Sequence, residues 1–102
     1  MIKHIVMWKL KDQAEGKSKA ENAAEMKSLL EALPAKIDAL KSAEVGINII
    51  EDVNDAVCDI VLTTTCDSLE DLKEYASHPE HQKVVQFILK VASERRVVDY
   101  IS

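Results

Sequence analysis

The chain has 102 residues, of which 47% are hydrophobic and 30% are charged, and it contains only two glycines and two prolines. This composition excludes a disordered chain and predicts one folded domain over residues 1–102. The formal net charge is −5, and apart from Arg95 and Arg96 the basic residues are scattered. Because no concentrated positive field is available for a phosphate backbone, nucleic acid is not expected as a partner.

Membrane insertion and secretion are also disfavoured. The apolar runs are only a few residues long, far short of the about 20 that a membrane-spanning helix needs, and the first residues resemble a strand and not a signal peptide. We therefore expect a cytoplasmic protein with no membrane partner. Cys58 and Cys66 lack the spacing of a redox or metal-binding motif, so they are expected to be reduced side chains without a chemical role.

The first half of the chain predicts a strand, a helix and a second strand. Residues 2–10 alternate as a strand does, and Ser18 to Glu21 has the form of a helix capping box. Helical spacing then continues until Pro34 interrupts it. The residues expected on one face of the first strand are Ile2, His4, Val6, Trp8 and Leu10, those of the helix are Ala23, Met26, Leu30 and Leu33, and those of the second strand are Ala43, Val45, Ile47 and Ile49.

The second half predicts a third strand, a broken helix and a fourth strand. Residues 51–55 are acidic and typical of a turn, and residues 56–65 are rich in β-branched side chains, so this run is expected to pair with the preceding strand as a hairpin. Ser68 begins a helix that breaks near His78, because Pro79 disfavours helical geometry in the residue before it. The charged residues 93–96 are expected to end the third helix, and residues 96–101 form the last strand.

This order of elements predicts the ferredoxin-like fold, an α+β architecture in which helices cover one face of a four-stranded antiparallel sheet. The plan leaves the other face of the sheet bare. Since the strand face with Val6 and Trp8 is apolar, we expect two copies to pair as a homodimer through the sheet faces that carry these residues.

At this level of detail the chain resembles the stress-responsive α/β-barrel (Dabb) domain family. The similarity rests on IKHIVMWKLK at the start, AEVGINI in the middle, DIVLTTTCDSLEDLKEY after it, and HPEHQKV at the helix break. The resemblance implies a dimeric α+β barrel that encloses a cavity. It implies little about activity, because the family includes stress-induced stable proteins as well as a plant cyclase.

The similarity to that cyclase implies a catalytic pair at Tyr75 and His81, with His4 on a cavity-facing strand position. Physical reasoning points the same way, because His81 lies near the start of a helix, where the positive end of the helix dipole favours a neutral imidazole. A neutral imidazole can accept a proton, and a nearby phenol can donate a hydrogen bond to a developing enolate. The candidate ligand-binding residues are His4, Val6, Trp8 and His78.

Structural roles remain open for the same residues. His78 can cap the third helix, His81 can bond a carbonyl group or solvent, and Tyr75 can pack into the core with its hydroxyl satisfied. The strand aspartates Asp59 and Asp99 are expected to be solvated or to lie at the end of the sheet.

No metal or other cofactor is predicted, since the three histidines lack a supporting carboxylate or thiolate at ligand spacing. Two functions remain open. One is a protein that binds a small organic ligand in the barrel cavity, with lyase or cyclase-type acid–base chemistry. The other is a non-catalytic stress-related protein that acts through stable self-assembly.

Overall fold

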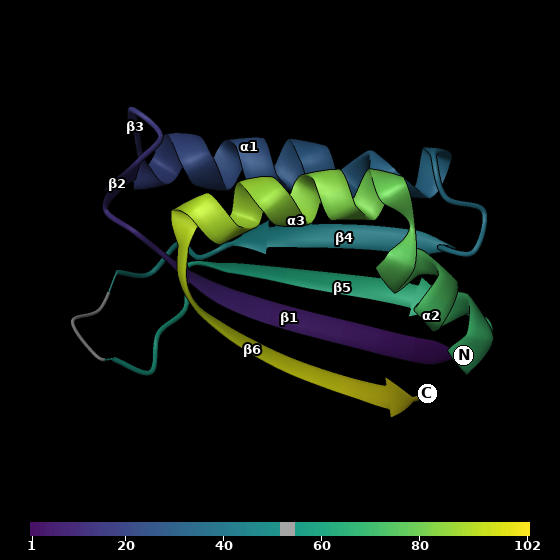
Figure 1. Cartoon of the computed structure of the whole chain (residues 1–102). Coiled ribbons are helices and arrows are strands. Elements are labelled where there is room, and N and C mark those ends of the chain that lie inside the picture. Colours follow the sequence, from purple (N-terminus) through teal and green to yellow (C-terminus); the bar gives the residue numbers. More distant parts are fainter. Residues whose placement is uncertain (52–54) are drawn as a thin grey trace.

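The computed structural model describes residues 1–51 and 55–102 and confirms the ferredoxin-like α+β fold (Figure 1). The four main strands form an antiparallel sheet in the order β4-β5-β1-β6, and the helices lie over one of its faces. The strands are β1 (Ile2–Leu10), β4 (Ser42–Ile47), β5 (Ile60–Cys66) and β6 (Ala92–Ile101), and the helices are α1 (Lys19–Glu31), α2 (Leu69–Ser77) and α3 (Pro79–Val91). No helix in the described ranges is long and apolar enough to cross a membrane.

The helix boundaries follow the local signals in the sequence. The Ser18 side chain accepts a hydrogen bond from the Glu21 backbone N–H, and the Glu21 carboxylate accepts one from the Ser18 N–H, so the predicted capping box is confirmed. Ser68 caps α2 by accepting from the backbone N–H of Asp71. The break between α2 and α3 falls at His78, directly before Pro79, as predicted.

The structure differs from the predicted elements in several places. The polar stretch before α1 contains a small hairpin, β2 (Gln13–Ala14) and β3 (Lys17–Ser18), whose turn includes Gly16 at a φ of +74°. A short 3-10 helix covers Leu33–Ala35, and β5 begins at Ile60 instead of residue 56. The predicted turn at residues 51–55 lies partly outside the described residues, since it includes 52–54.

The prediction that residues 93–96 end the third helix was wrong. The helix already ends at Val91, and β6 begins at Ala92, which pairs with Leu10 of β1. The charged side chains fit a strand because β6 is an edge strand that is exposed along almost its whole length. The charged residues 93–96 therefore indicate an exposed edge strand and not the end of a helix.

The expected pairing face also requires a correction. Val6 and Trp8 are only 1% and 4% exposed, and they belong to the core between the sheet and the helices. The same face of the sheet carries Leu62 and Val45, which lie beside Val6 through the register of β1 with β5 and of β5 with β4. The surface with Val6 and Trp8 is thus covered by the chain's own helices and is not free to pair with a second copy.

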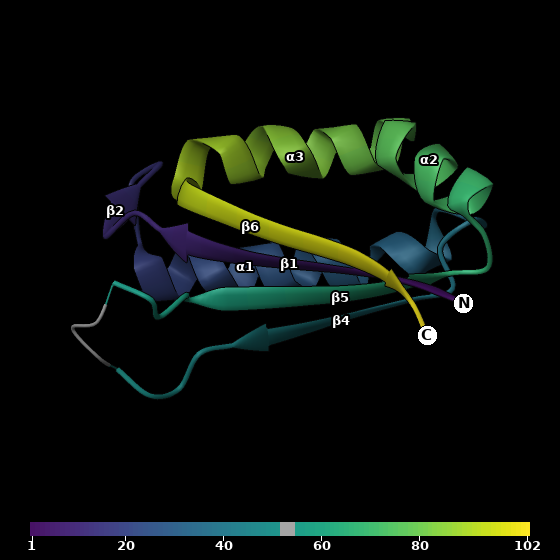
Figure 2. The same cartoon turned by 90° about the horizontal axis from the view of Figure 1, so that it is seen from below.

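No described residue range forms an element that covers the opposite face of the sheet, and Figure 2 views this face with the strands in front of α1. We call it the open face, and its apolar members are Ile5, Met7, Val61, Val98 and Tyr100, which the strand register places side by side. Met7, Val98 and Tyr100 are each at least 40% exposed. An apolar strip of this kind on a sheet is typical of an interaction surface.

Candidate functional site

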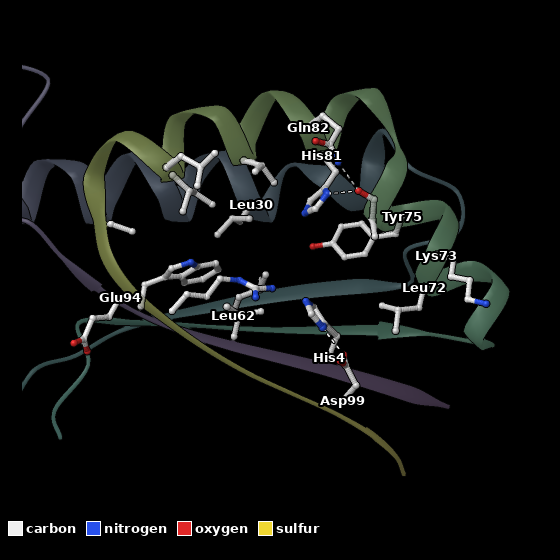
Figure 3. A pocket seen from close by; sticks show the side chains of 18 of the residues that line it. His4, Leu30, Leu62, Leu72, Lys73, Tyr75, His81, Gln82, Glu94 and Asp99 are labelled. Carbon is white, nitrogen blue, oxygen red and sulfur yellow. Dashed lines mark hydrogen bonds and ion pairs between the residues drawn. The ribbon is translucent and has the colours of Figure 1, made fainter.

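A pocket of about 730 Å³ lies between the helix-facing side of the sheet and the α2–α3 segment. Its lining combines apolar side chains with several polar ones, and the rings of His4, Tyr75 and His81 project into it (Figure 3). Pockets of this size and character are typical of sites for small organic molecules. The predicted residues His4, Val6, Trp8, Tyr75 and His81 all line it.

His81 is the third residue of α3 and enters the pocket from the first turn of this helix, and its ring is oriented by the helix break. The Nδ1 atom lies 2.9 Å from the carbonyl oxygen of Ala76, which also accepts a 2.7 Å hydrogen bond from the Gln82 side chain. Since a carbonyl oxygen can only accept, Nδ1 carries the proton of the neutral ring. The Nε2 atom is then left as the proton acceptor.

The electrostatic surroundings keep His81 neutral. Burial lowers the pKa of its ring below the ordinary value of 6.5, and electrostatic interactions with His4, Arg95 and His78 lower it further. The hydrogen bond to Ala76 opposes this shift in the pKa but does not outweigh it. The expected neutral state therefore has burial as its main cause, where the sequence had suggested the helix terminus.

Tyr75 lies beside His81 at the end of α2 and is only 1% exposed. The ring centroids of Tyr75 and His81 are 4.5 Å apart, and those of Tyr75 and His4 are 6.3 Å apart. Figure 3 shows the tyrosine hydroxyl directed between the two imidazole rings. Although this hydroxyl is buried, it has no hydrogen-bond partner among the described residues.

The same burial controls the ionisation of the phenol. Desolvation raises the pKa of Tyr75 well above its ordinary value, the Cys66 thiol adds to the rise, and Arg95 partly opposes it. The phenol is consequently protonated at all physiological pH values and can donate one hydrogen bond. The structural alternative in which this hydroxyl is satisfied within the core does not describe the present arrangement.

His4 reaches the pocket from the middle of β1. Its Nδ1 is hydrogen-bonded to the Asp99 carboxylate of β6, and the two residues are directly opposite in the strand register. A carboxylate accepts only, so Nδ1 again carries the proton when the ring is neutral. The sequence interpretation missed this role of Asp99, because a contact across strands depends on the register of β1 with β6.

His78 differs from the other predicted residues, since it is not part of the pocket lining. Its Nδ1 accepts a 3.1 Å hydrogen bond from the backbone N–H of Glu80 and so caps α3. The capping alternative therefore describes His78 well. Within residues 1–51 and 55–102 no group of three potential ligands is close enough together to hold a metal, and the absence of a metal requirement stays a prediction.

Arg95 is one of several polar lining residues that the sequence interpretation did not include. It lies opposite Trp8 in the register of β1 with β6, which places both side chains on the helix-facing side of the sheet. The signal available in the sequence was the alternation of β6, where Arg95, Val97 and Asp99 share one face.

Three comparisons place the chain among known proteins. A stress-response A/B barrel domain-containing protein of Arabidopsis thaliana is 28% identical over 104 residues, and the chain spans only 37% of its length. A solved dimeric protein from Bacteroides fragilis with a ferredoxin-like fold and unknown function is 37% identical, with a TM-score of 0.81 over 97% of this chain and 93% of that one.

A hydroxynitrile lyase from Passiflora edulis is 17% identical and shares the fold, with a TM-score of 0.81 over 99% of this chain and 92% of that one. The family model for the Stress responsive A/B Barrel Domain matches residues 2–102. The chain therefore belongs to the Dabb family.

Proposed function

We propose that this Dabb protein binds a small organic ligand in the pocket and transfers a proton at a carbon atom next to a carbonyl group. The observation that carries this proposal is the buried Tyr75 hydroxyl, which lies beside the His81 ring and has no partner in the described part of the chain. An unsatisfied buried hydroxyl is costly, and a ligand carbonyl oxygen in the pocket supplies the missing acceptor.

The residues have complementary roles in this reaction. His81 Nε2 takes the proton from the carbon atom, and the electron pair of the broken C–H bond moves to form an enolate. The Tyr75 hydroxyl donates its hydrogen bond to the enolate oxygen, where negative charge develops. His4, held by Asp99, forms the opposite wall, and return of the proton from His81 completes a cycle without any net oxidation.

A test follows the exchange of α-carbon hydrogen for deuterium in 2-heptanone by proton NMR in D₂O. We expect the protein to accelerate exchange, and Tyr75→Phe and His81→Gln each to lower the rate by about 100-fold, the usual effect of removing an oxyanion donor or an acid–base group. His78→Gln is the matched control, because this histidine caps α3 outside the pocket. Equal rates in all four proteins, at the level of buffer, would contradict the catalytic proposal.

Self-association is the second part of the proposal, and the open face supports it. A monomer would expose the strip that contains Met7, Val98 and Tyr100, and the similar Bacteroides protein is described as dimeric. We therefore propose a homodimer in which two open faces pack together. Light scattering at micromolar concentration should give the mass of a dimer, and Val98→Glu should shift it toward that of a monomer.

The open face also supports an alternative function, a non-catalytic stress-related protein that acts through stable self-assembly. This alternative predicts a dimer that resists dilution together with a pocket that binds no ligand. Retention of a normal dimer by Tyr75→Phe, combined with no exchange activity in the unmodified protein, would favour it.

A further inference from the structure

The pocket contains a positive charge that the proton-transfer proposal does not use. Arg95 is an exposed residue of the lining, and in the described part of the chain its guanidinium group has no ion pair and no hydrogen bond. Two acidic residues of β6, Glu94 and Asp99, also line the pocket, but each is paired with a group other than Arg95. Asp99 is paired with His4, and Glu94 lies 3.5 Å from the Lys9 ammonium group and 3.9 Å from the Arg96 guanidinium group.

The charge of Arg95 acts on Tyr75 and His81, which line the same pocket. It favours the deprotonated form of Tyr75 and the neutral form of His81, so it contributes to the pKa of both groups. Arg95 itself is exposed to solvent, so its interaction with a ligand is screened more than it would be in a fully buried site. A cation in such a position attracts a negatively charged group on a ligand.

The net negative charge of the protein makes a local cation necessary for binding an anion. A chain with a formal net charge of −5 repels anions at long range. An anionic ligand is therefore retained only where a local group compensates, and the planar guanidinium group can hold a carboxylate through two parallel hydrogen bonds.

We propose that Arg95 is the anion-binding residue of the pocket and that the ligand is a carboxylic acid with an apolar body. The carboxylate lies at Arg95 on the β6 side, and the apolar body lies against Trp8, Leu62 and Ile88. The pocket volume of about 730 Å³ is sufficient for a carboxylic acid of eight or more carbon atoms, by comparison with the roughly 300–1,000 Å³ typical of ligand pockets. This proposal rests on the ligand-binding part of the proposed function but not on its catalytic part.

The test uses the fluorescence of Trp8, which is the only tryptophan of the chain and lines the pocket beside Arg95. Octanoate and octanamide serve as probes, because they have the same apolar body and differ in charge. We expect the unmodified protein to bind octanoate about tenfold more tightly than octanamide, the size of a charge-assisted hydrogen bond relative to a neutral one. Arg95→Gln should abolish this preference, and Arg95→Lys should retain part of it.

Lys73→Gln is the matched control, since it removes another positive charge from the lining. Figure 3 shows the Lys73 side chain directed away from the space between Tyr75 and His4. The preference for octanoate should therefore persist in this variant. Its loss there to the same extent as in Arg95→Gln would show a general charge effect and overturn the assignment.

The remaining outcomes separate this proposal from the proposed function. Equal binding of octanoate and octanamide by the unmodified protein would overturn the role of Arg95 while leaving the pocket as a ligand site. Binding of neither probe at millimolar concentration would overturn both the anion site and the ligand-binding function. A clear octanoate preference without deuterium exchange would support the anion site and contradict only the catalytic step.

Discussion

Replacing Tyr75 by phenylalanine should make the protein more stable and less active. The side chain is 1% exposed, and its hydroxyl has no hydrogen-bond partner among the described residues. A buried polar group without a partner costs about 1–3 kcal/mol relative to a satisfied one. Phenylalanine removes that cost and keeps the ring packing, so we take about 1 kcal/mol as the gain in the free energy of unfolding.

For a domain of about this length, a gain of about 1 kcal/mol corresponds to a rise in melting temperature of roughly 4–8 °C. Thermal unfolding followed by circular dichroism at pH 7 measures it. Gln86→Ala is the control, because this α3 side chain is exposed and lies away from the open face, so its loss should change stability by less than about 0.5 kcal/mol. The exchange assay on the same Tyr75→Phe sample should show the loss of activity described above.

A decrease in melting temperature of several degrees for Tyr75→Phe would refute this reasoning. It would mean that the hydroxyl makes a stabilising hydrogen bond in the folded protein, as in the structural alternative in which the linker is only a helix junction. An unchanged exchange rate in the same variant would independently remove the phenol from the proposed reaction.

Three further predictions concern stability and pH. Ser18→Ala removes the hydroxyl that caps α1 and should lower the free energy of unfolding by about 1 kcal/mol, measured by urea denaturation, whereas the exposed Ser102→Ala should have no effect. Leu62→Ala removes a core side chain that is 2% exposed and should cost about 2–5 kcal/mol, and a smaller cost would mean that the surrounding core collapses into the space. The pKa of His81 is lower in the folded state than in the unfolded chain, so the unfolded chain takes up the proton first as the pH falls below 6.5. The protein should therefore lose stability as the pH falls from about 6.5 to the pKa of folded His81. His81→Gln should flatten this part of the stability profile, and an unchanged profile would exclude His81 as its source.

The sequence predicted the elements whose signals are local. The capping box at Ser18, the cap at Ser68 and the break before Pro79 depend only on neighbouring residues, and each lies where it was expected. Tyr75 and His81 could be placed together for the same reason, because both flank one helix break. Predicting that these two residues lie close together therefore required no knowledge of contacts between distant segments.

The features that could not be predicted depend on contacts between distant segments. Both faces of β1 carry apolar residues, so periodicity alone could not decide that the helices cover Val6 and Trp8 while Ile5 and Met7 face outward. The partnership of His4 with Asp99 requires the strand register as well.

Arg95 was overlooked for a similar reason. Charged residues next to a helix end are commonly exposed, and nothing in the local sequence distinguishes an arginine that faces a pocket from one that faces solvent. Only the register of β1 with β6 places it opposite Trp8.

The break at Pro79 has a consequence for the direction of proton transfer. If α2 continued into α3, the backbone N–H of Glu80 would take the Ala76 carbonyl as its helical partner, and His81 would lose the acceptor for its Nδ1 proton. Because the helix is interrupted, Glu80 donates to His78 instead, and the Ala76 carbonyl remains available to His81. Pro79, which does not line the pocket, thereby favours the tautomer of His81 in which Nδ1 carries the proton and Nε2 is the proton acceptor of the proposed reaction.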